Sequence, residues 1–445
     1  MVSMKRLCCL LAGVAVWSEC VYAQNMVQQG LDELFRSADE HNTSIGSQRT
    51  AIERARLNVE AAKSQRLPDL TTSLSVNYIG TGQLLNRNLS YYANPDFPHW
   101  GNAFMLEAQQ VVYSGGALSS GIRLAELGKE MSELEEQSVR QDVHMLLAGL
   151  YLQRHSLQNR LKVVEHNISL ADTLISKTND RFRQGVVLKN DVTRYELMRE
   201  QMNLARVTIE DNITIVDKQL QTAVNSGEEN CYRLLPQEAF SSYAEGGALD
   251  AIPAENVWQS EALSGSSSLQ KTLTAIEMSR QQEKMTRAAS LPKVALVAAD
   301  NLQGPNTINV PALDKNVNYW YVGVGVSYDI SSLYKNNKKI RSAAAGTKFS
   351  QEQRQVAKEG LSDAVHAAYM GLQTSKSELL TRRKSVELAR QNYYVIAERY
   401  NNGLALVTDM TDAANVRLDA ELQLVDAQIS VVMAMCRLKY VCGHL

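Results

Sequence analysis

The sequence predicts an α+β membrane protein: long α-helical coiled-coil hairpins, four short strands that contribute to a transmembrane β-barrel, and an internal two-fold repeat. Three observations lead to this fold class. A motif occurs twice, two long stretches lack proline, and four segments alternate between apolar and polar residues. The motif predicts the turns of the hairpins, the proline-free stretches predict their helices, and the alternating segments predict the strands.

The repeat is clearest in the motif itself. RFRQGVVLKNDV at 181–192 returns as RYNNGLALVTDM at 399–410, so an arginine, a glycine and an aspartate recur 218 positions (399 − 181) later. SQRLPDL at 64–70 and AASLPKV at 288–294 match near the start of each copy. Such self-similarity indicates one structural unit present twice. We expect two repeats, each with a helix, a strand pair and a long helical hairpin, at 24–225 and 257–445, joined by a linker at 226–256.

Long helices are predicted by the positions of the eight prolines. None falls in 99–235 or 312–445, and a proline inside a helix costs about 3 kcal/mol. From Leu118 to Gln184 the composition remains helical, rich in leucine, alanine, glutamate and arginine. A helix of this length would extend about 100 Å, and such helices persist only when they pack against partners in a coiled coil.

The repeated motif is predicted to form the turn of each hairpin. In each copy a glycine, Gly185 or Gly403, fits the left-handed residue that follows a helix. Asn190 and Thr408 are suitable N-caps for the returning helix, and the aspartate that follows suits its positive end. The two tips are expected at 184–191 and 402–409.

Four segments with a period of two residues are predicted as strands, at 69–80, 102–112, 292–300 and 319–330. Their lengths, about 9–12 residues, suit tilted strands that cross a bilayer with apolar side chains toward lipid and polar ones toward a lumen. The predicted lipid-facing residues are Leu70, Leu74, Val76, Phe104, Leu106, Trp320, Val322, Val324 and Val326.

The strand pattern alone leaves a second interpretation open, because a half-buried sheet in a soluble domain shows the same alternation. Four strands cannot close a barrel, and open strand edges do not occur in lipid. If the strands cross a membrane, several chains must therefore combine them. Two chains would supply eight strands around a filled interior, and three would supply twelve, wide enough for a channel.

The first residues are typical of a secretory signal peptide. Lys5 and Arg6 precede an apolar run, and small residues follow before a predicted cleavage after Ala23. The apolar run is too short to span a membrane. We therefore expect residues 1–23 to be removed during export and the remaining chain to act outside the cytoplasm.

Three cysteines follow the predicted cleavage site: Cys231, Cys436 and Cys442. In an oxidising compartment Cys231 could form a disulfide with Cys436 or Cys442. Unpaired, buried thiols are the alternative interpretation.

Other functional classes find little support in the residues. The net charge of −2 gives no electrostatic reason to expect nucleic-acid binding. His144, His155 and His166 recur every 11 residues. This spacing is about 16 Å along a helix, too far for a shared metal, so we expect a solvated or lumen-facing stripe. We predict no cofactor and no enzymatic activity.

The repeats, strands and tips together resemble the TolC family of outer-membrane efflux proteins. The resemblance covers nearly the whole chain after the signal peptide, and the two tips, each with an aspartate six positions after its glycine, are its most specific part. It implies a homotrimer whose strands form one β-barrel in the lipid bilayer of a Gram-negative outer membrane. It also implies that the helices form an α-barrel tunnel extending into the periplasm.

The function implied by the resemblance is that of a passive duct in a tripartite efflux or type I secretion system. Its implied partners are a periplasmic adaptor (membrane fusion) protein and an inner-membrane efflux pump or ABC transporter. A periplasmic coiled-coil scaffold or adaptor with a small soluble β-domain is the alternative. The alternative explains the long helices and the signal peptide. It does not explain two strand pairs at equivalent points of the two repeats.

The resemblance also implies roles for residues at the tips. The family's periplasmic gate has a tyrosine three positions before the glycine and aspartates six and nine positions after it, matched here by Tyr400, Asp409 and Asp412. Asp191 matches the acidic position of the first copy, whereas Ala405 replaces a gate arginine of the family. Helix-end stabilisation for the aspartates and coiled-coil packing for Tyr400 are the alternatives. The candidate adaptor contacts are Gly185, Val186, Leu188, Gly403, Leu404 and Leu406.

Overall fold

The computed structural model of the chain describes residues 31–94, 98–225, 252–305 and 313–445. The predicted signal peptide, most of the predicted linker and Cys231 lie outside these ranges. Two compact units are present, and each combines segments from both halves of the sequence. The strand unit contains 51–133 and 271–354, and the helical unit contains the remainder.

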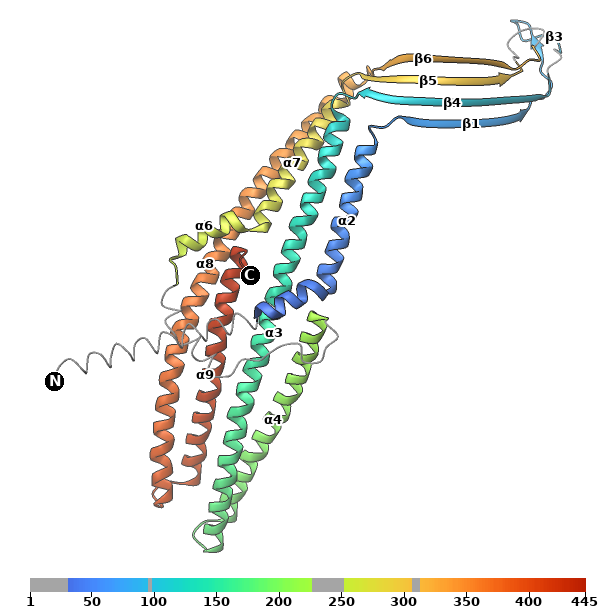
Figure 1. The fold of residues 1–445 in the computed structure, drawn as a ribbon. Helices are drawn as coiled ribbons and strands as arrows, with labels where there is room; N and C mark the ends of the chain where they lie inside the picture. Colours follow the sequence, from blue (N-terminus) through green and yellow to red (C-terminus); the bar gives the residue numbers. More distant parts are fainter. Residues whose placement is uncertain (1–30, 95–97, 226–251, 306–312) are drawn as a thin grey trace. The chain divides into compact units, whose positions relative to one another are not determined.

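The strand unit carries one four-stranded antiparallel sheet, in the order β1-β4-β5-β6 (Figure 1). A two-stranded ribbon lies in the loop between β1 and β4. The four segments with a period of two are therefore confirmed as strands. The strands are β1 (Asp69–Tyr78), β2 (Leu84–Leu85), β3 (Tyr91–Ala93), β4 (Trp100–Tyr113), β5 (Lys293–Gly304) and β6 (Val317–Ser327).

The strand register places all nine predicted lipid-facing residues on one face of the sheet. Directly opposed residues of neighbouring strands share a face. Leu74 lies opposite Phe104, and a row further along joins Leu106 through Asp300 to Trp320. In the single chain the nine side chains are 36% (Phe104) to 75% (Leu74 and Trp320) exposed. An exposed apolar face of this kind marks a contact with lipid or protein.

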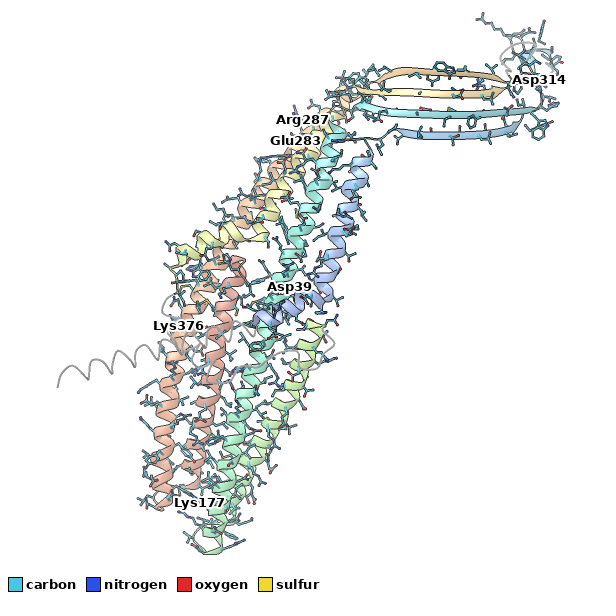
Figure 2. All side chains as sticks on the ribbon, in the orientation of Figure 1. Asp39, Lys177, Glu283, Arg287, Asp314 and Lys376 are labelled. Atoms are coloured by element: carbon cyan, nitrogen blue, oxygen red, sulfur yellow. The ribbon has the colours of Figure 1, made fainter. Side chains whose placement is uncertain are left out.

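Polar contacts join the helices of the strand unit. α7 (Ser267–Ala288) follows α6 (Glu255–Gly265) and packs beside the start of α8 (Ser332–Asn401). On α7, Arg287 pairs with Glu283 at 2.6 Å, and Thr347 of α8 donates to the same carboxylate at 2.9 Å (Figure 2). These two hydrogen bonds lower the pKa of Glu283, so the carboxylate remains ionised at neutral pH.

Two antiparallel hairpins make up most of the helical unit. α3 (Ala117–Arg183) turns into α4 (Lys189–Val224), and α8 turns into α9 (Val407–Cys442). The helix predicted from Leu118 to Gln184 is thus confirmed to within one residue at each end. α4 and α9 are both 36 residues long, as the internal repeat requires. None of the described helices combines the length and the apolar character needed to cross a membrane.

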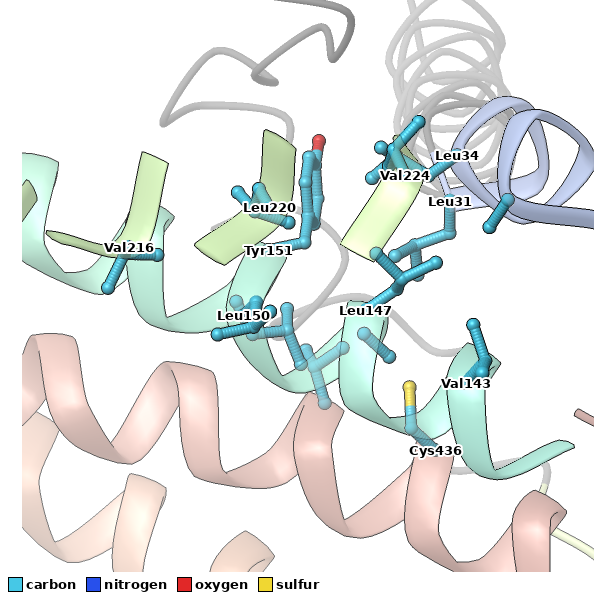
Figure 3. Packing of buried hydrophobic residues seen from close by; sticks show 14 of the residues in the cluster. Leu31, Leu34, Val143, Leu147, Leu150, Tyr151, Val216, Leu220, Val224 and Cys436 are labelled. Atoms are coloured by element: carbon cyan, nitrogen blue, oxygen red, sulfur yellow. The ribbon is translucent and has the colours of Figure 1, made fainter. Parts of the chain in front are cut away.

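The main core of the helical unit joins α3, α4 and α9 to a short helix at 31–41, which precedes α2 (Thr43–Ser64) (Figure 3). Leu147, Tyr151 and Leu220 are fully buried there. Burying one such side chain stabilises the fold by about 1.5–3 kcal/mol. Cys436 belongs to this core. Within the described residues Cys436 and Cys442 are not joined in a disulfide, and burial raises the pKa of both thiols, to about 11 for Cys442.

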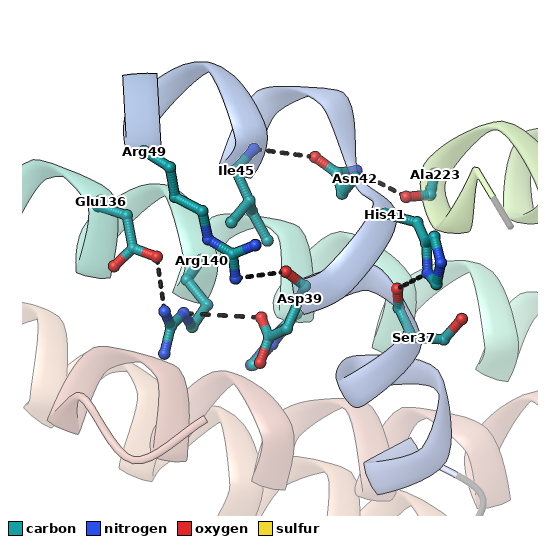
Figure 4. Close-up of polar contacts among 10 residues, drawn as sticks. Ser37, Asp39, His41, Asn42, Ile45, Arg49, Glu136, Arg140 and Ala223 are labelled. Atoms are coloured by element: carbon teal, nitrogen blue, oxygen red, sulfur yellow. Dashed lines mark hydrogen bonds and ion pairs between the residues drawn. The ribbon is translucent and has the colours of Figure 1, made fainter. Parts of the chain in front are cut away.

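A polar cluster attaches the 31–41 helix to α3 (Figure 4). Arg140 of α3 reaches Asp39 at 3.6 Å. His144 contacts the same carboxylate at 3.0 Å and stacks on Phe35. His155 is also buried, with Arg154 and Lys162 nearby; burial lowers its pKa to about 4. The expectation of a solvated or lumen-facing stripe was therefore wrong for two of the three histidines, because neighbouring helices cover that face of α3.

Candidate functional site

The two hairpin tips have the same backbone geometry. Gly185 and Gly403 adopt φ values of 74° and 73°. In the first tip the N–H of Val186 donates to the carbonyl of Arg181 at 3.0 Å, and in the second Leu404 donates to Arg399 at 2.8 Å. These are the hydrogen bonds that close a helix with a left-handed glycine. The predicted role of both glycines in the turn is confirmed by this geometry.

Replacing Gly403 with alanine should destabilise the protein by about 1–2 kcal/mol, because an L side chain is strained at positive φ. Nothing lies within 4 Å of the added Cβ, so the strain would come from the backbone alone. Gly360, inside α8, has equally open surroundings without a positive φ. The Gly360→Ala control should stabilise by about 0.5–1 kcal/mol. Thermal unfolding followed by circular dichroism measures both, and equal midpoints would contradict the strain argument.

The returning helices begin two residues earlier than predicted. Their N-caps are Leu188 and Leu406, neither of which has a capping side chain, so the expected caps at Asn190 and Thr408 were wrong. The aspartate three positions on supplies the missing acceptor. Asp191 accepts the N–H of Leu188 at 3.0 Å, and Asp409 accepts the equivalent N–H at 3.0 Å in the second tip. Each carboxylate therefore holds its turn closed and interacts favourably with the positive end of the helix dipole.

Asp412 differs from these two aspartates. It lies one turn further along α9 and is exposed. Among the described residues no hydrogen bond or ion pair involves its side chain. Its charge is therefore available to the surroundings of the tip, whereas one oxygen of Asp409 is already engaged.

Tyr400 lies inside the protomer and is only 6% exposed. Its hydroxyl is 3.4 Å from Oγ1 of Thr178, on the first hairpin. Arg181 reaches across from the same hairpin: its guanidinium lies 4.9 Å from the centre of the Tyr400 ring and donates to the carbonyls of Tyr400 and Asn401, at 3.2 and 2.8 Å. We call these contacts of Arg181 the arginine clasp.

The arginine clasp was missed by the sequence interpretation, although Arg181 is part of the repeated motif. Its acceptors are backbone carbonyls at the end of α8, which lack partners within the helix. The guanidinium donates to both, in addition to the N–H of Gly403 that reaches the Tyr400 carbonyl at 3.1 Å, and places a positive charge at the negative helix end. The clasp thus fastens the second tip to the first within one chain.

A second polar group lies along the hairpins above the tips. Arg417 of α9 is 9% exposed, lies 3.9 Å from the centre of the Tyr393 ring and donates to Asn167 at 2.7 Å. These contacts join three helices beside a cavity of about 510 Å³, whose polar lining includes Lys162, His166, Arg390 and Glu421. The described part of the chain contains no group of side chains that could hold a metal ion.

Comparison with known proteins identifies this architecture. The family model for outer membrane efflux proteins matches residues 34–226 and 258–444, most of the chain. The chain belongs to this family. The match leaves out the predicted signal peptide and most of the predicted linker.

Several outer membrane efflux relatives are similar along most of the chain. Outer membrane protein TolC of Salmonella enteritidis is 20% identical over 333 residues, which span 73% of this chain and 66% of the relative's own length. The crystal structure of VceC from Vibrio cholerae has a TM-score of 0.74 at 17% identity, covering 93% of this chain and 96% of VceC. The open state of the MtrE channel of Neisseria gonorrhoeae gives 0.70 at 14% identity, over 93% and 89%.

Membership in the outer membrane efflux family confirms several sequence predictions together. The resemblance to the TolC family, the α+β fold with its internal repeat and the location in a Gram-negative outer membrane are all confirmed. The members of this family are outer-membrane channels. This confirms the interpretation as a duct, rather than as a scaffold or an enzyme.

The remaining tip residues of this efflux protein form an exposed apolar surface. Four branched side chains are between 68% and 73% exposed: Val186, Leu188, Leu404 and Leu406. Nothing lies within 4 Å of the Cβ position of either tip glycine. The tips therefore present apolar groups beside acidic ones.

Proposed function

We propose that the protein is a homotrimeric duct that carries substrates across the periplasm and the outer membrane. Three sheets would form one barrel in the bilayer, and three pairs of hairpins would form a tunnel in the periplasm. The observation that carries the proposal is the four-stranded sheet with one apolar face and two unpaired edge strands, β1 and β6. In lipid those edges must pair, and three chains are the smallest number that encloses a channel.

The tips are the proposed gate. Three copies of the exposed Asp412, with Asp409 one turn away, would bring carboxylates together where the tunnel narrows. Rings of carboxylates attract and select cations. Asp191 would add to this field from the first tip, and Tyr400 would act through the packing that joins the tips of one chain.

The exposed apolar tip surface is the proposed contact for a periplasmic adaptor. Exposure of the leucine and Val186 side chains to water is unfavourable, and a partner with an apolar surface would cover them. Gly185 and Gly403 would allow close approach, because they add no side chain to the turn. An inner-membrane pump, either an efflux pump or an ABC transporter, would supply substrate and energy to the assembled duct.

Purified protein should form trimers in detergent and insert into planar bilayers as a channel with small, uniform conductance steps, because the tips are closed without an adaptor. In cells it should sediment with the outer membrane and resist carbonate extraction. A matched preparation that is heat-unfolded before addition to the bilayer is the control. Folded trimers that neither conduct nor resist carbonate would contradict the proposal.

A further inference from the structure

The two repeats differ in the partners of one arginine. Arg181 forms the arginine clasp to the end of α8. Its counterpart 218 positions (399 − 181) later is Arg399, which is exposed. Among the described residues, the Arg399 side chain takes part in no hydrogen bond, ion pair or ring contact. The same motif therefore supplies one guanidinium with hydrogen-bond partners, that of Arg181, and one without a partner among the described residues, that of Arg399.

The repeat also identifies what Arg399 would bind. The acceptors of the clasp, Tyr400 and Asn401, correspond to Phe182 and Arg183 at the end of α3. Both helix ends close with the same backbone geometry, so the two carbonyls are presented alike. The Phe182 ring, equivalent to the ring beneath the Arg181 guanidinium, is 40% exposed. In the described structure no side chain donates to these two carbonyls.

A coupled exchange of side chains supports this correspondence. In the contact within one chain, the Tyr400 hydroxyl faces the Thr178 hydroxyl. At the equivalent positions Tyr400 becomes Phe182 and Thr178 becomes Ile396. Both members of a polar pair are thus replaced by apolar residues. Replacing one alone would leave a hydroxyl without a partner in an apolar contact, which is unfavourable.

We propose that Arg399 forms a second clasp between subunits. Its guanidinium donates to the carbonyls of Phe182 and Arg183 of the partner subunit and lies over the ring of the partner's Phe182, while Ile396 packs against that ring. The occupant of this surface is a second copy of the chain, so the inference rests on the trimer proposed above.

Ring closure explains why one clasp is within the chain and the other is between chains. In a closed ring of three chains, hairpins of the two kinds alternate, and each has a neighbour of the other kind on both sides. One of these two contacts lies inside a chain and the other between chains. The planar fork of arginine suits two adjacent carbonyls.

Cross-linking tests the contact itself. Phe182→Cys/Ile396→Cys, treated with a short bismaleimide, should give covalent dimers and trimers on denaturing gels, at least tenfold above either single variant. The matched pair Thr178→Cys/Tyr400→Cys should give none beyond the wild-type background, because those positions meet within one chain. Light scattering of the untreated protein separates the two proposals. A trimer without inter-subunit cross-links would overturn the clasp alone, and a monomer would overturn the proposed trimer as well.

Conductance tests what the clasp does. Arg399→Gln should raise the single-channel conductance at least twofold, since the tips lose a fastening at each of three interfaces. Arg399→Lys should give an intermediate rise, because it keeps the charge and loses the fork. Arg341→Gln, at an exposed arginine of α8 outside the tips, is the control and should match wild type. Equal conductance of all four proteins would overturn the role of Arg399 in closure.

Discussion

Replacing Leu74 with arginine should keep the protein out of the outer membrane. Leu74 lies in the middle of β1, is 75% exposed and belongs to the apolar face defined by the strand register. An arginine on the lipid face near the bilayer midplane costs about 2–4 kcal/mol in each subunit. Because three subunits would share one barrel, the cost applies three times, and we expect almost complete loss of carbonate-resistant protein from the outer-membrane fraction.

Ser73→Arg is the matched control for this prediction. Ser73 precedes Leu74 in the same strand and lies on the opposite, polar face, where an arginine would project into water. We expect it to fractionate like wild type and to change only ion selectivity. If both variants were lost equally, the assignment of the two faces would be wrong; if both were retained, the sheet would not contact lipid.

Neutralising the acidic tip should have the second large effect, on the pore itself. In Asp409→Asn/Asp412→Asn, the asparagine at 409 can still accept the N–H of Leu406 through its carbonyl oxygen, so the turn is preserved while the charge is removed. Without carboxylates to attract and retain cations, the reversal potential in a salt gradient should move toward zero. The small wild-type conductance steps should become several-fold larger, because cations are no longer retained in the constriction. Both quantities come from single-channel recordings in planar bilayers.

Two comparisons make the gate experiment specific. Asp363→Asn removes a charge from an exposed aspartate of α8 outside the tips and should leave both quantities unchanged. Asp409→Ala/Asp412→Ala removes the charge together with the acceptor at the helix start, which costs about 1 kcal/mol more. A conducting protein with wild-type selectivity in the asparagine variant would show that the constriction lies elsewhere in the duct.

Local patterns in the sequence predicted the elements that local forces decide. Gly185 and Gly403 indicated the positions of the turns, because few other residues adopt a positive φ. The alternation around Leu74 and Val324 identified the strands and their apolar face, since a strand repeats every two residues. The absence of proline allowed helices as long as α3.

Features that depend on distant segments were not predictable in this way. His144 and His155 share a face of α3, but their burial depends on helices that arrive from elsewhere in the chain. The N-caps were misplaced because Asp191 and Asp409 reach back three positions and allow a leucine to start the helix. The sequence predicted no contact for the Arg181 side chain, because its acceptors lie on the other hairpin.

The unpaired edges of the sheet also have a consequence for biogenesis. A newly exported chain that is still alone would expose β1 and β6 to water, together with an apolar face that no other protein covers. Exposed edge strands of this kind readily pair with wrong neighbours. Folding of the sheet, entry into lipid and recruitment of two further chains would therefore have to be tightly coupled in time. The yield of functional ducts should depend steeply on the rate of synthesis and on periplasmic chaperones that shield single chains.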